Sequence, residues 1–289
     1  MRLRSLLFVP GDSERKFARA QASGADALIL DLEDSVAPSQ KSAARAHVAS
    51  LIDPAPRPWR FFVRPNPFDT GLTADDLAAV VKPGLDGLLV PKAEGAADVV
   101  RLGAMLDELE AAAGMAIGTV KIAVVATETP LAMFNLGSYT PPHPRLVGLT
   151  WGAEDLAAAV GATANRGADG QWTFPYQVAR TQCLFAAAAA GVAPIDTLYA
   201  DFRNEEGLAA DCRLARRDGF TGRLAIHPDQ VAVINDGFSP SADDVAHARR
   251  VVETFAAQPD AGTIGIDGKM YDIPHLKAAQ RTLAAAGEA

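Results

Sequence analysis

The segment Ala25–Glu33, ADALILDLE, decides how the rest of the sequence is interpreted. Its apolar residues are continuous rather than alternating, which is typical of a strand buried on both faces of a parallel sheet. The segment ends in the carboxylates Asp31 and Glu33, and Asp34 follows at once. Because unpaired charges are costly to bury beside Ile and Leu, these acids must face solvent, a metal ion or a basic partner.

Seven further segments have the same strand-like character, and Ala-rich amphipathic segments separate them. They are residues 5–10, 60–66, 86–92, 120–129, 145–152, 195–202 and 222–228. Parallel strands joined by helices form either a closed barrel or an open, doubly wound sheet, and eight such units favour the barrel. The sequence therefore predicts an α/β fold, a (β/α)8 TIM barrel, with the doubly wound sheet as the alternative.

The pattern changes after the eighth strand. Residues 229–238 and 241–258 have helical periodicity, residues 259–274 are rich in Gly and Asp, and residues 275–286 form a last helical segment. This tail exceeds what a minimal barrel needs, and no linker composition separates it from the barrel. We therefore predict a barrel over residues 1–230 and a C-terminal extension over 231–289 that belongs to the same domain.

The composition is that of an ordinary soluble protein, with 49% hydrophobic and 21% charged residues among 289. A formal charge of −8 excludes a general nucleic-acid-binding surface, so any anionic ligand needs a local basic patch. Cys183 and Cys212 lack CxxC spacing and are expected to be buried, reduced thiols. No segment resembles a signal peptide or a membrane span, so the prediction is a cytoplasmic protein without nucleic-acid or membrane partners.

Charged and polar side chains follow nearly every predicted strand. A single polar residue at a strand end commonly just begins a loop. In a barrel, however, these ends converge on one mouth, where active sites lie, and their joint occurrence favours a functional site. The residues concerned are Asp31, Glu33, Asp34, Arg64, Asn66, Lys92, Glu128, Glu154, Asp155, Asp201 and His227.

Some of these acids are candidate metal ligands. The sequence contains no HExxH motif and no Cys/His cluster, which argues against zinc. Carboxylates from neighbouring strands, with room for water and substrate oxygens, suit Mg²⁺. Glu128 and Asp155 follow adjacent strands within reach of one ion, and Asp31 or Glu33 remain alternative ligands.

The first strand-to-helix turn, VPGDSERKFARA (9–20), carries a basic cluster. Gly11 permits a tight turn, and Arg15 and Arg19 lie four residues apart, on one helical face, with Lys16 alongside. A helix start with clustered cations favours a phosphate ligand, although a solvated basic face fits the spacing equally well. The segment is not a P-loop, because it lacks GxxxxGK[ST].

Eight short motifs together resemble the citrate lyase β-subunit-like family (HpcH/HpaI aldolase/citrate lyase), which contains acyl-CoA lyases related to malyl-CoA and citramalyl-CoA lyase. Their order and spacing cover nearly the whole chain. The motifs are RSLLFVPGDSERK (4–16), LILDLEDSV (28–36), FVRPN (62–66), VPK (90–92), ETP (128–130), WGAEDL (151–156), IHPDQ (226–230) and GKMYDIP (268–274).

The resemblance implies an Mg²⁺-dependent carbon–carbon lyase. Such an enzyme cleaves a 3-hydroxyacyl-CoA of the malyl-, citramalyl- or citryl-CoA type to acetyl-CoA and a 2-oxo acid by retro-Claisen chemistry. Glu128 and Asp155 match the family's magnesium-binding carboxylates, with Glu128 also beside the substrate, and Arg64 matches the arginine that contacts the substrate. Asp31, Glu33 and Asp34 then become side chains that orient Arg64 or metal-bound water.

Further residues match family positions outside the metal site. Phe8, Arg15 and Arg19 match positions that contact the acyl-CoA. Asp272 matches a catalytic acid/base that the C-terminal segment delivers, as a lid, onto a neighbouring subunit, which implies a homo-oligomer, a trimer or hexamer. Tyr271 departs from the family pattern, which usually has an aliphatic residue before this Asp.

Other activities remain open alongside the lyase. A thioesterase would use the same metal and Arg64 to release free CoA and the hydroxyacid. The β subunit of a citrate lyase complex would instead act on an acyl chain carried by an acyl carrier protein, and the basic turn at Arg15 and Arg19 favours free CoA over that carrier. Intact Glu128, Asp155, Arg64 and Asp272 argue against a non-catalytic barrel. No residue in the sequence specifies the acyl chain.

Overall fold

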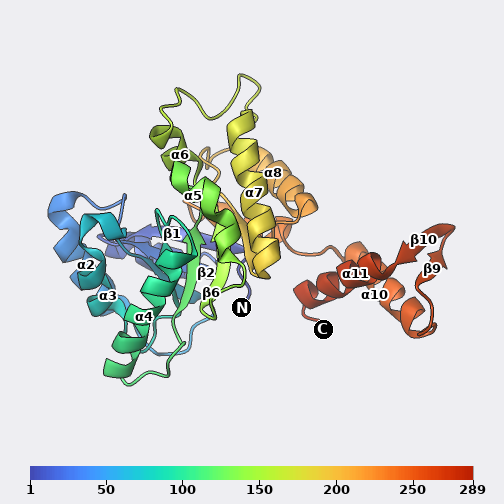
Figure 1. Ribbon diagram of the computed structural model, residues 1–289, viewed down its shortest axis with the longest axis horizontal. Helices are drawn as coiled ribbons and strands as arrows, with labels where there is room; N and C mark the ends of the chain where they lie inside the picture. The colour runs from blue at the N-terminus through green and yellow to red at the C-terminus, as the bar shows by residue number, and fades with distance from the viewer. Residues whose placement is uncertain (289) are drawn as a thin grey trace. The chain divides into compact units, whose positions relative to one another are not determined.

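The computed structural model describes residues 1–288 and contains a closed barrel of eight parallel strands in sequential order. Helices surround these strands (Figure 1). The predicted (β/α)8 TIM barrel is therefore confirmed, and the doubly wound alternative is wrong. The strands are β1 (Ser5–Pro10), β2 (Ala27–Asp31), β3 (Arg60–Arg64), β4 (Gly87–Val90), β5 (Lys121–Val125), β6 (Leu146–Thr150), β7 (Ala193–Asp196) and β8 (Gly222–Ala225).

The barrel closes because β1 pairs with β8 as well as with β2, with Leu6 opposite Leu224 on one side and Ala27 on the other. Apolar side chains from all eight strands or their flanks fill the interior. Large and small residues complement one another there. A Cβ atom on Gly87 would lie 2.6 Å from the ring of Phe62, so β4 carries glycine where β3 carries a bulky ring.

Helices follow the strands as the amphipathic pattern predicts. The helices that accompany the barrel strands are α1 (Glu14–Gln21), α2 (Lys41–Leu51), α3 (Thr73–Val80), α4 (Ala96–Ala112), α5 (Pro130–Asn135), α6 (Ala153–Ala159), α7 (Phe174–Ala190), α8 (Glu205–Asp218) and α9 (Gln230–Gly237). Short 3₁₀ turns η1 (Pro38–Gln40), η2 (Phe68–Thr70) and η3 (Leu136–Tyr139) lie between them. Cys183 on α7 and Cys212 on α8 are buried and free, as predicted. Within residues 1–288, no helix has both the length and the apolar character needed to cross a membrane.

Strand β7 differs from its prediction. It ends at Asp196, so the predicted strand end at Asp201 is wrong, and Asp201 lies exposed in the following loop. The reason is the buried Asp196 carboxylate, which accepts hydrogen bonds from Trp151 Nε1 at 2.7 Å and from the main-chain N–H of Thr197 at 2.9 Å. Arg223 Nη2 approaches it at 2.9 Å and Arg180 Nη2 at 3.1 Å.

This buried cluster predicts a pH-dependent stability. Burial raises the pKa of Asp196, but the charges of Arg223 and Arg180 lower it by a larger amount. The net pKa therefore lies below its ordinary value. A lowered carboxyl pKa stabilises the fold above the unfolded value of about 3.9, and the contribution is lost as pH falls through the folded pKa. We expect Asp196→Asn to cost about 3 kcal/mol at pH 7, because buried Arg223 and partly buried Arg180 lose their shared buried carboxylate and keep only the more exposed Asp211 and Asp218.

Urea unfolding of wild type and variant at pH 7, 5 and 3 measures this effect. The difference between the two proteins should be full at pH 7 and 5 and should shrink at pH 3. Asp218→Asn is the matched control: this more exposed carboxylate pairs with Arg180 at 2.8 Å, and we expect a loss below about 1 kcal/mol. An equal loss for the two variants would contradict the assignment.

A second compact unit begins at Phe238 and is described here by itself. It comprises α10 (Ala242–Ala256), β9 (Thr263–Ile266), β10 (Lys269–Asp272) and α11 (Ile273–Ala286). Val251, Phe255 and Ile264 belong to its own hydrophobic core. The hairpin of β9 and β10 was not predicted, although its Asp267–Gly268 turn, with φ of 50° and 75°, has the Asp-Gly sequence that favours such hairpins.

Candidate active site

Arg64 is the centre of a charged network at the carboxyl ends of the barrel strands. Asp31 ends β2 and Arg64 ends β3, and the two residues pair in register. The guanidinium therefore meets the carboxylate with both arms, Nε to Oδ1 and Nη2 to Oδ2, each at 2.7 Å. Asp31 also accepts the main-chain N–H groups of Glu33 and Ser35. This bidentate pair fixes the plane of the guanidinium.

Glu33 continues the network from Arg64 to Lys92. Its Oε2 lies 3.0 Å from Arg64 Nη1, and its Oε1 lies 2.5 Å from Lys92 Nζ. Asp34 is more exposed and lies farther out, 4.0 Å from Arg64 Nη1 and 3.6 Å from Lys92 Nζ. Asp31, Glu33 and Asp34 thus face two cations, Arg64 at the end of β3 and Lys92 after β4.

The surroundings of Arg64 and Asp31 favour their charged forms. Burial lowers the pKa of Arg64, but Asp31 and Glu33 raise it more, so the net pKa lies above its ordinary value. For Asp31 the effect of burial is outweighed by Arg64, and its pKa is lowered. For Glu33, burial outweighs Arg64 and Lys92, and its pKa is raised. Arg64 therefore stays positive and tightly held.

Lys92 connects this network to the two predicted metal ligands. Its backbone adopts φ of 50°, a left-handed conformation that is uncommon for lysine. In this conformation its main-chain N–H donates to the Glu128 carboxylate, and its Nζ lies 3.3 Å from Asp155 Oδ1. One residue thus contacts Glu33, Glu128 and Asp155. Sequence reasoning placed Lys92 at a strand end but not among the site residues, and the VPK motif was the available signal.

Glu128 is a buried carboxylate close to two other acids, Asp155 and Glu33. It follows β5, and a Cβ atom on Gly152 would lie 2.6 Å from its Cγ, so the close approach requires glycine there. Burial raises the pKa of Glu128 to about 8, the charges of Asp155 and Glu33 add to the increase, and the Lys92 N–H opposes it. A bound cation would offset this cost of ionising Glu128.

The residues present fit a magnesium ion. Glu128 and Asp155, the latter in the first turn of α6, offer oxygen ligands of the kind that Mg²⁺ prefers. Within residues 1–288, no group of three or more His, Cys, Asp or Glu side chains could hold a metal ion. A cation here would therefore take most of its ligands from water and from a bound substrate, as Mg²⁺ commonly does.

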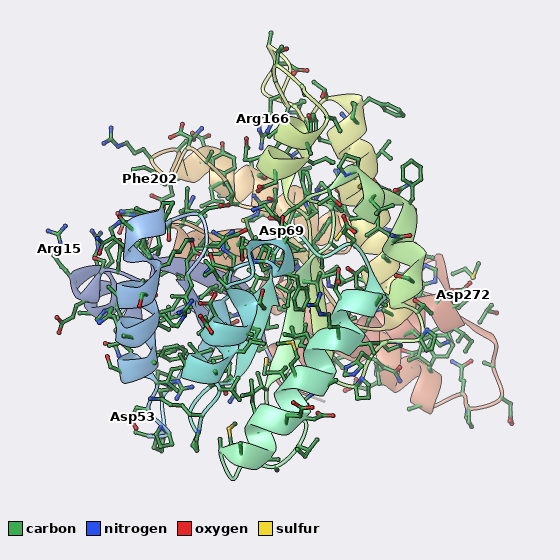
Figure 2. The ribbon with its side chains drawn as sticks, turned by 60° about the vertical axis from the view of Figure 1, so that its left-hand side comes forward. Arg15, Asp53, Asp69, Arg166, Phe202 and Asp272 are labelled. Atoms are coloured by element: carbon green, nitrogen blue, oxygen red, sulfur yellow. The ribbon has the colours of Figure 1, made fainter. Side chains whose placement is uncertain are left out.

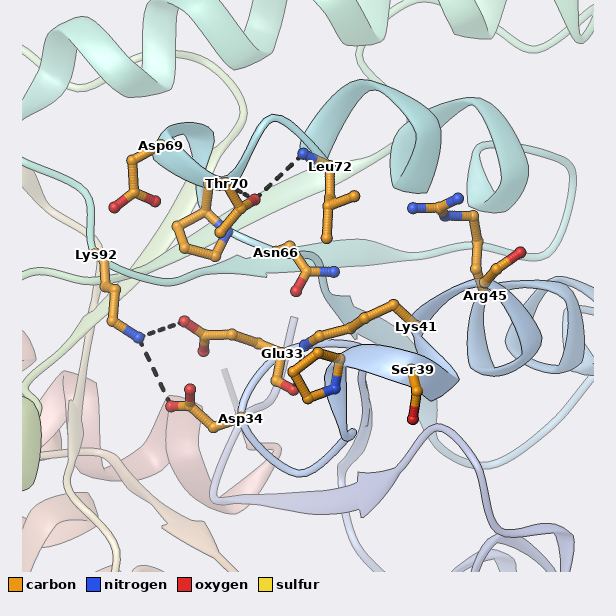
Figure 3. A pocket seen from close by; sticks show the side chains of 13 residues that line it. Glu33, Asp34, Ser39, Lys41, Arg45, Asn66, Asp69, Thr70, Leu72 and Lys92 are labelled. Atoms are coloured by element: carbon orange, nitrogen blue, oxygen red, sulfur yellow. Dashed lines mark hydrogen bonds and ion pairs between the residues drawn. The ribbon is translucent and has the colours of Figure 1, made fainter.

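A cavity of about 580 Å³ opens beside this network (Figure 3). The Lys92 ammonium reaches Glu33 and Asp34 at its edge, and Asn66 and Thr70, from the loop after β3, lie on another side. Asn66 stabilises the loop after β3, because its Nδ2 donates a hydrogen bond to Asp76 at 2.7 Å. The cavity therefore leads directly to the charged groups.

The basic turn after β1 lies at the same end of the barrel. The Arg64 guanidinium lies 4.8 Å from the ring centroid of Phe8, on β1. Phe8, Arg15 and Arg19 line a cavity of about 440 Å³ with Lys16, and Ser13 caps α1. The structure thus brings together the three residues expected to contact an acyl-CoA.

Asp272 lies in the second unit, at the N-terminal cap of α11. Its Oδ1 accepts the main-chain N–H of His275 at 3.4 Å and lies 2.5 Å from His275 Nδ1. The hydrogen bond from His275 lowers the pKa of Asp272. Tyr271, the departure from the family pattern, contacts the rings of His247 and His275.

Comparison with known proteins identifies the family. Residues 4–228 match the family described as HpcH/HpaI aldolase/citrate lyase. The chain belongs to this family. The membership expected from the eight motifs is confirmed, and so is the expectation that the chain is an enzyme of the citrate lyase β-subunit-like group.

Relatives in the HpcH/HpaI family cover almost the full chain. The (3S)-malyl-CoA thioesterase of Cereibacter sphaeroides is 35% identical over 286 residues, 98% of this chain and 94% of that protein. The citrate lyase subunit beta of Haemophilus influenzae is 34% identical over 97% of this chain and 95% of its own. The crystal structure of CitE from Mycobacterium tuberculosis with magnesium, acetoacetate and coenzyme A has a TM-score of 0.79 at 35% identity and covers 99% of both chains.

Proposed function

We propose that the protein is an Mg²⁺-dependent lyase that cleaves a 3-hydroxyacyl-CoA of the malyl-, citramalyl- or citryl-CoA type to acetyl-CoA and a 2-oxo acid. The observation that carries the proposal is the arrangement around Lys92, which contacts Glu128 and Asp155 and joins them to Arg64 through Glu33. This arrangement places two carboxylates that can bind a cation, Glu128 and Asp155, near the fixed positive charge of Arg64. A relative that binds magnesium, acetoacetate and coenzyme A supports it.

Glu128 and Asp155 would hold the metal ion, with Glu128 also beside the substrate. Once bound, Mg²⁺ supplies Lewis acidity and a template for substrate oxygens. Asp155 has a partly exposed side chain, whereas Glu128 is buried, so the two carboxylates offer the ion one ligand that solvent reaches and one within the barrel mouth.

Arg64 would stabilise the negative charge that develops on the thioester enolate when the carbon–carbon bond breaks. Asp31 holds two of its nitrogens and Glu33 faces the third, so no reorganisation is needed when this charge appears. The ring of Phe8 lies beside the guanidinium.

Asp272 would act as the acid/base that moves the proton at the methyl carbon of the acetyl-CoA enolate. The substrate hydroxyl loses one proton as the 2-oxo acid forms and the methyl carbon gains one, so the cleavage takes up no net proton. Asp272 is partly exposed at the start of a helix in a separately compact unit, a position suited to act on a neighbouring subunit. We therefore propose a homo-oligomer, a trimer or hexamer, in which the second unit serves as the lid. The free thiols of Cys183 and Cys212 support a cytoplasmic location.

A second candidate function is hydrolysis of the same thioester. The similarity to (3S)-malyl-CoA thioesterases over 98% of the chain favours it. In this reaction water attacks the thioester carbonyl, the carbon–sulfur bond breaks, and free CoA and the hydroxyacid leave. The similarity to citrate lyase beta subunits supports the alternative of a carrier-linked substrate.

One assay separates these activities. Purified protein with Mg²⁺ is incubated with malyl-CoA and with citramalyl-CoA, and free thiol and 2-oxo acid are both measured. The lyase produces 2-oxo acid with no free thiol. Thiol without 2-oxo acid would establish the thioesterase, and turnover of only a carrier-linked ester would establish the subunit of a complex.

A further inference from the structure

A histidine beside Asp272 has no role in the chemistry proposed so far. Asp272 is labelled in Figure 2, and 37% of its side chain is exposed, so another subunit can reach it. Asp272 ends β10, and His275 follows in the first turn of α11. Oδ1 of Asp272 lies 2.5 Å from His275 Nδ1 and accepts the main-chain N–H of His275 at 3.4 Å. Two groups of one residue therefore hold a single oxygen of this carboxylate.

The second oxygen of Asp272 is left available. Within residues 1–288, Oδ2 of Asp272 has no hydrogen-bond partner. A carboxylate that is held through one oxygen keeps the other for proton transfer, and its orientation is set before a substrate arrives. The hydrogen bond from His275 is also the largest influence on the pKa of Asp272, and it lowers that pKa. His275 thus affects both the orientation and the charge of the carboxylate.

An aromatic ring supports the imidazole of His275. The ring of Tyr271 meets it edge to face, with centroids 5.3 Å apart and planes at 72°. Tyr271 itself packs on the hydrophobic core of the second unit and pairs with Ile264 across the hairpin of β9 and β10. His275 therefore rests on a ring that is anchored in its own unit. The residue that departs from the family pattern is the one that supports it.

Titratable and charged groups from α10 also face this cluster. The imidazole of His247 lies against the ring of Tyr271, with centroids 5.5 Å apart. The guanidinium of Arg250 pairs with Asp267 in the hairpin turn at 2.6 Å. Arg250 is thus committed to the hairpin turn, which leaves the imidazole of His275 as the partner of the Asp272 carboxylate.

We propose that His275 is the positioning residue of Asp272, holding Oδ1 so that Oδ2 exchanges the proton with the methyl carbon. The inference rests on the proposed function, in which Asp272 is the acid/base. In the cleavage direction the Oδ2–H bond breaks as the new C–H bond forms, and the carboxylate regains the proton that the substrate hydroxyl releases. His275 acts through Asp272 and does not contact the substrate.

Three variants of the full chain separate positioning from helix capping, because Asp272 and His275 also cap α11. His275→Ala removes both functions, His275→Gln keeps a residue suited to the cap, and His275→Asn keeps an N–H donor at the place of Nδ1. With malyl-CoA or citramalyl-CoA and Mg²⁺, kcat of His275→Ala should fall about tenfold to a hundredfold, with KM within about twofold. His275→Gln should resemble His275→Ala, and His275→Asn should recover to within about threefold of wild type.

A second measurement does not depend on turnover. Carbon-13 NMR of the aspartate carboxyl groups, assigned with Asp272→Asn, gives the pKa of Asp272. This pKa should lie below its ordinary range in wild type and should rise toward that range in His275→Ala. His247→Ala is the matched control, since it removes the imidazole on α10 that contacts Tyr271, and it should change neither this pKa nor kcat.

The outcomes distinguish the positioning role from the proposed function. Wild-type kcat in folded His275→Ala, or equal kcat in the Gln and Asn variants, would overturn the positioning role while Asp272 remains the acid/base. A pKa of Asp272 that stays the same in His275→Ala would overturn it as well. If Asp272→Asn turns over as wild type does, the acid/base proposal fails, and the positioning role fails with it.

Discussion

Replacing Asp155 or Glu128 with alanine is expected to abolish turnover while the barrel stays folded. The two carboxylates provide the only protein ligands proposed for the metal ion, and without either one the substrate oxygens lose their template. The loss should be on the order of a thousandfold or more, because a Lewis acid supplies several kcal/mol of charge stabilisation. Ionised Glu128 is costly to bury, as its raised pKa shows, so its removal should not unfold the protein.

Three measurements make this prediction specific: turnover, Mg²⁺ binding by calorimetry, and thermal unfolding with and without Mg²⁺. Glu154→Ala is the matched control, since Glu154 lies beside Asp155 in the first turn of α6 but is exposed and faces Asn165 at 3.0 Å. Glu154→Ala should bind Mg²⁺ and turn over as wild type does. Normal turnover by a folded Asp155→Ala protein that binds no Mg²⁺ would refute the metal assignment.

Replacing Arg64 with methionine is expected to impair both stability and activity. The guanidinium is the shared partner of buried Asp31 and Glu33, so its loss leaves Asp31 without a cation and Glu33 with Lys92 alone, at a cost of about 3–5 kcal/mol. Turnover should fall about a hundredfold to a thousandfold, the usual effect of removing one group that stabilises developing charge. Arg64→Lys should recover part of the stability but little activity, because lysine cannot form the two-armed contact with Asp31.

A double variant separates the structural role of Arg64 from its proposed role toward the substrate. Asp31→Asn combined with Arg64→Met removes the uncompensated charge on Asp31 and should recover part of the unfolding free energy. Turnover should stay low, because the positive charge near the enolate is still missing. Recovery of turnover in the double variant would show that Arg64 acts only as a partner for the acids. Urea unfolding and the thiol and 2-oxo acid assays measure the two effects independently.

Much of the barrel could be predicted because strand burial leaves a direct signature in the sequence. Continuous apolar runs such as Leu28–Leu30 identify strands that are covered on both faces, and their regular spacing predicts the closed topology. The end of β7 could not be predicted in this way. The segment after Asp196 keeps strand-like residues, and only the partners of the buried carboxylate, Trp151 and Arg223, show why the strand stops there.

For the candidate site, the sequence could predict which types of residue take part and which strand ends carry them. Patterns at the strand ends and the family motifs together pointed to Glu128, Asp155 and Arg64. Neither shows contacts between residues that are distant in sequence, and Lys92 was therefore missed. Its role depends on a left-handed backbone conformation and on carboxylates from three different strand ends.

The sequence by itself determined the parallel barrel, the family and the ring of acids and bases at the strand ends, because burial and short motifs are local properties of the chain. Only the tertiary structure decided which charges meet. Asp31 and Arg64 pair because β2 and β3 are in register, and Lys92 faces Glu33 and Asp155 because the barrel brings their strand ends to one mouth. Electrostatic interactions depend on separation in space, and barrel closure is what sets those distances.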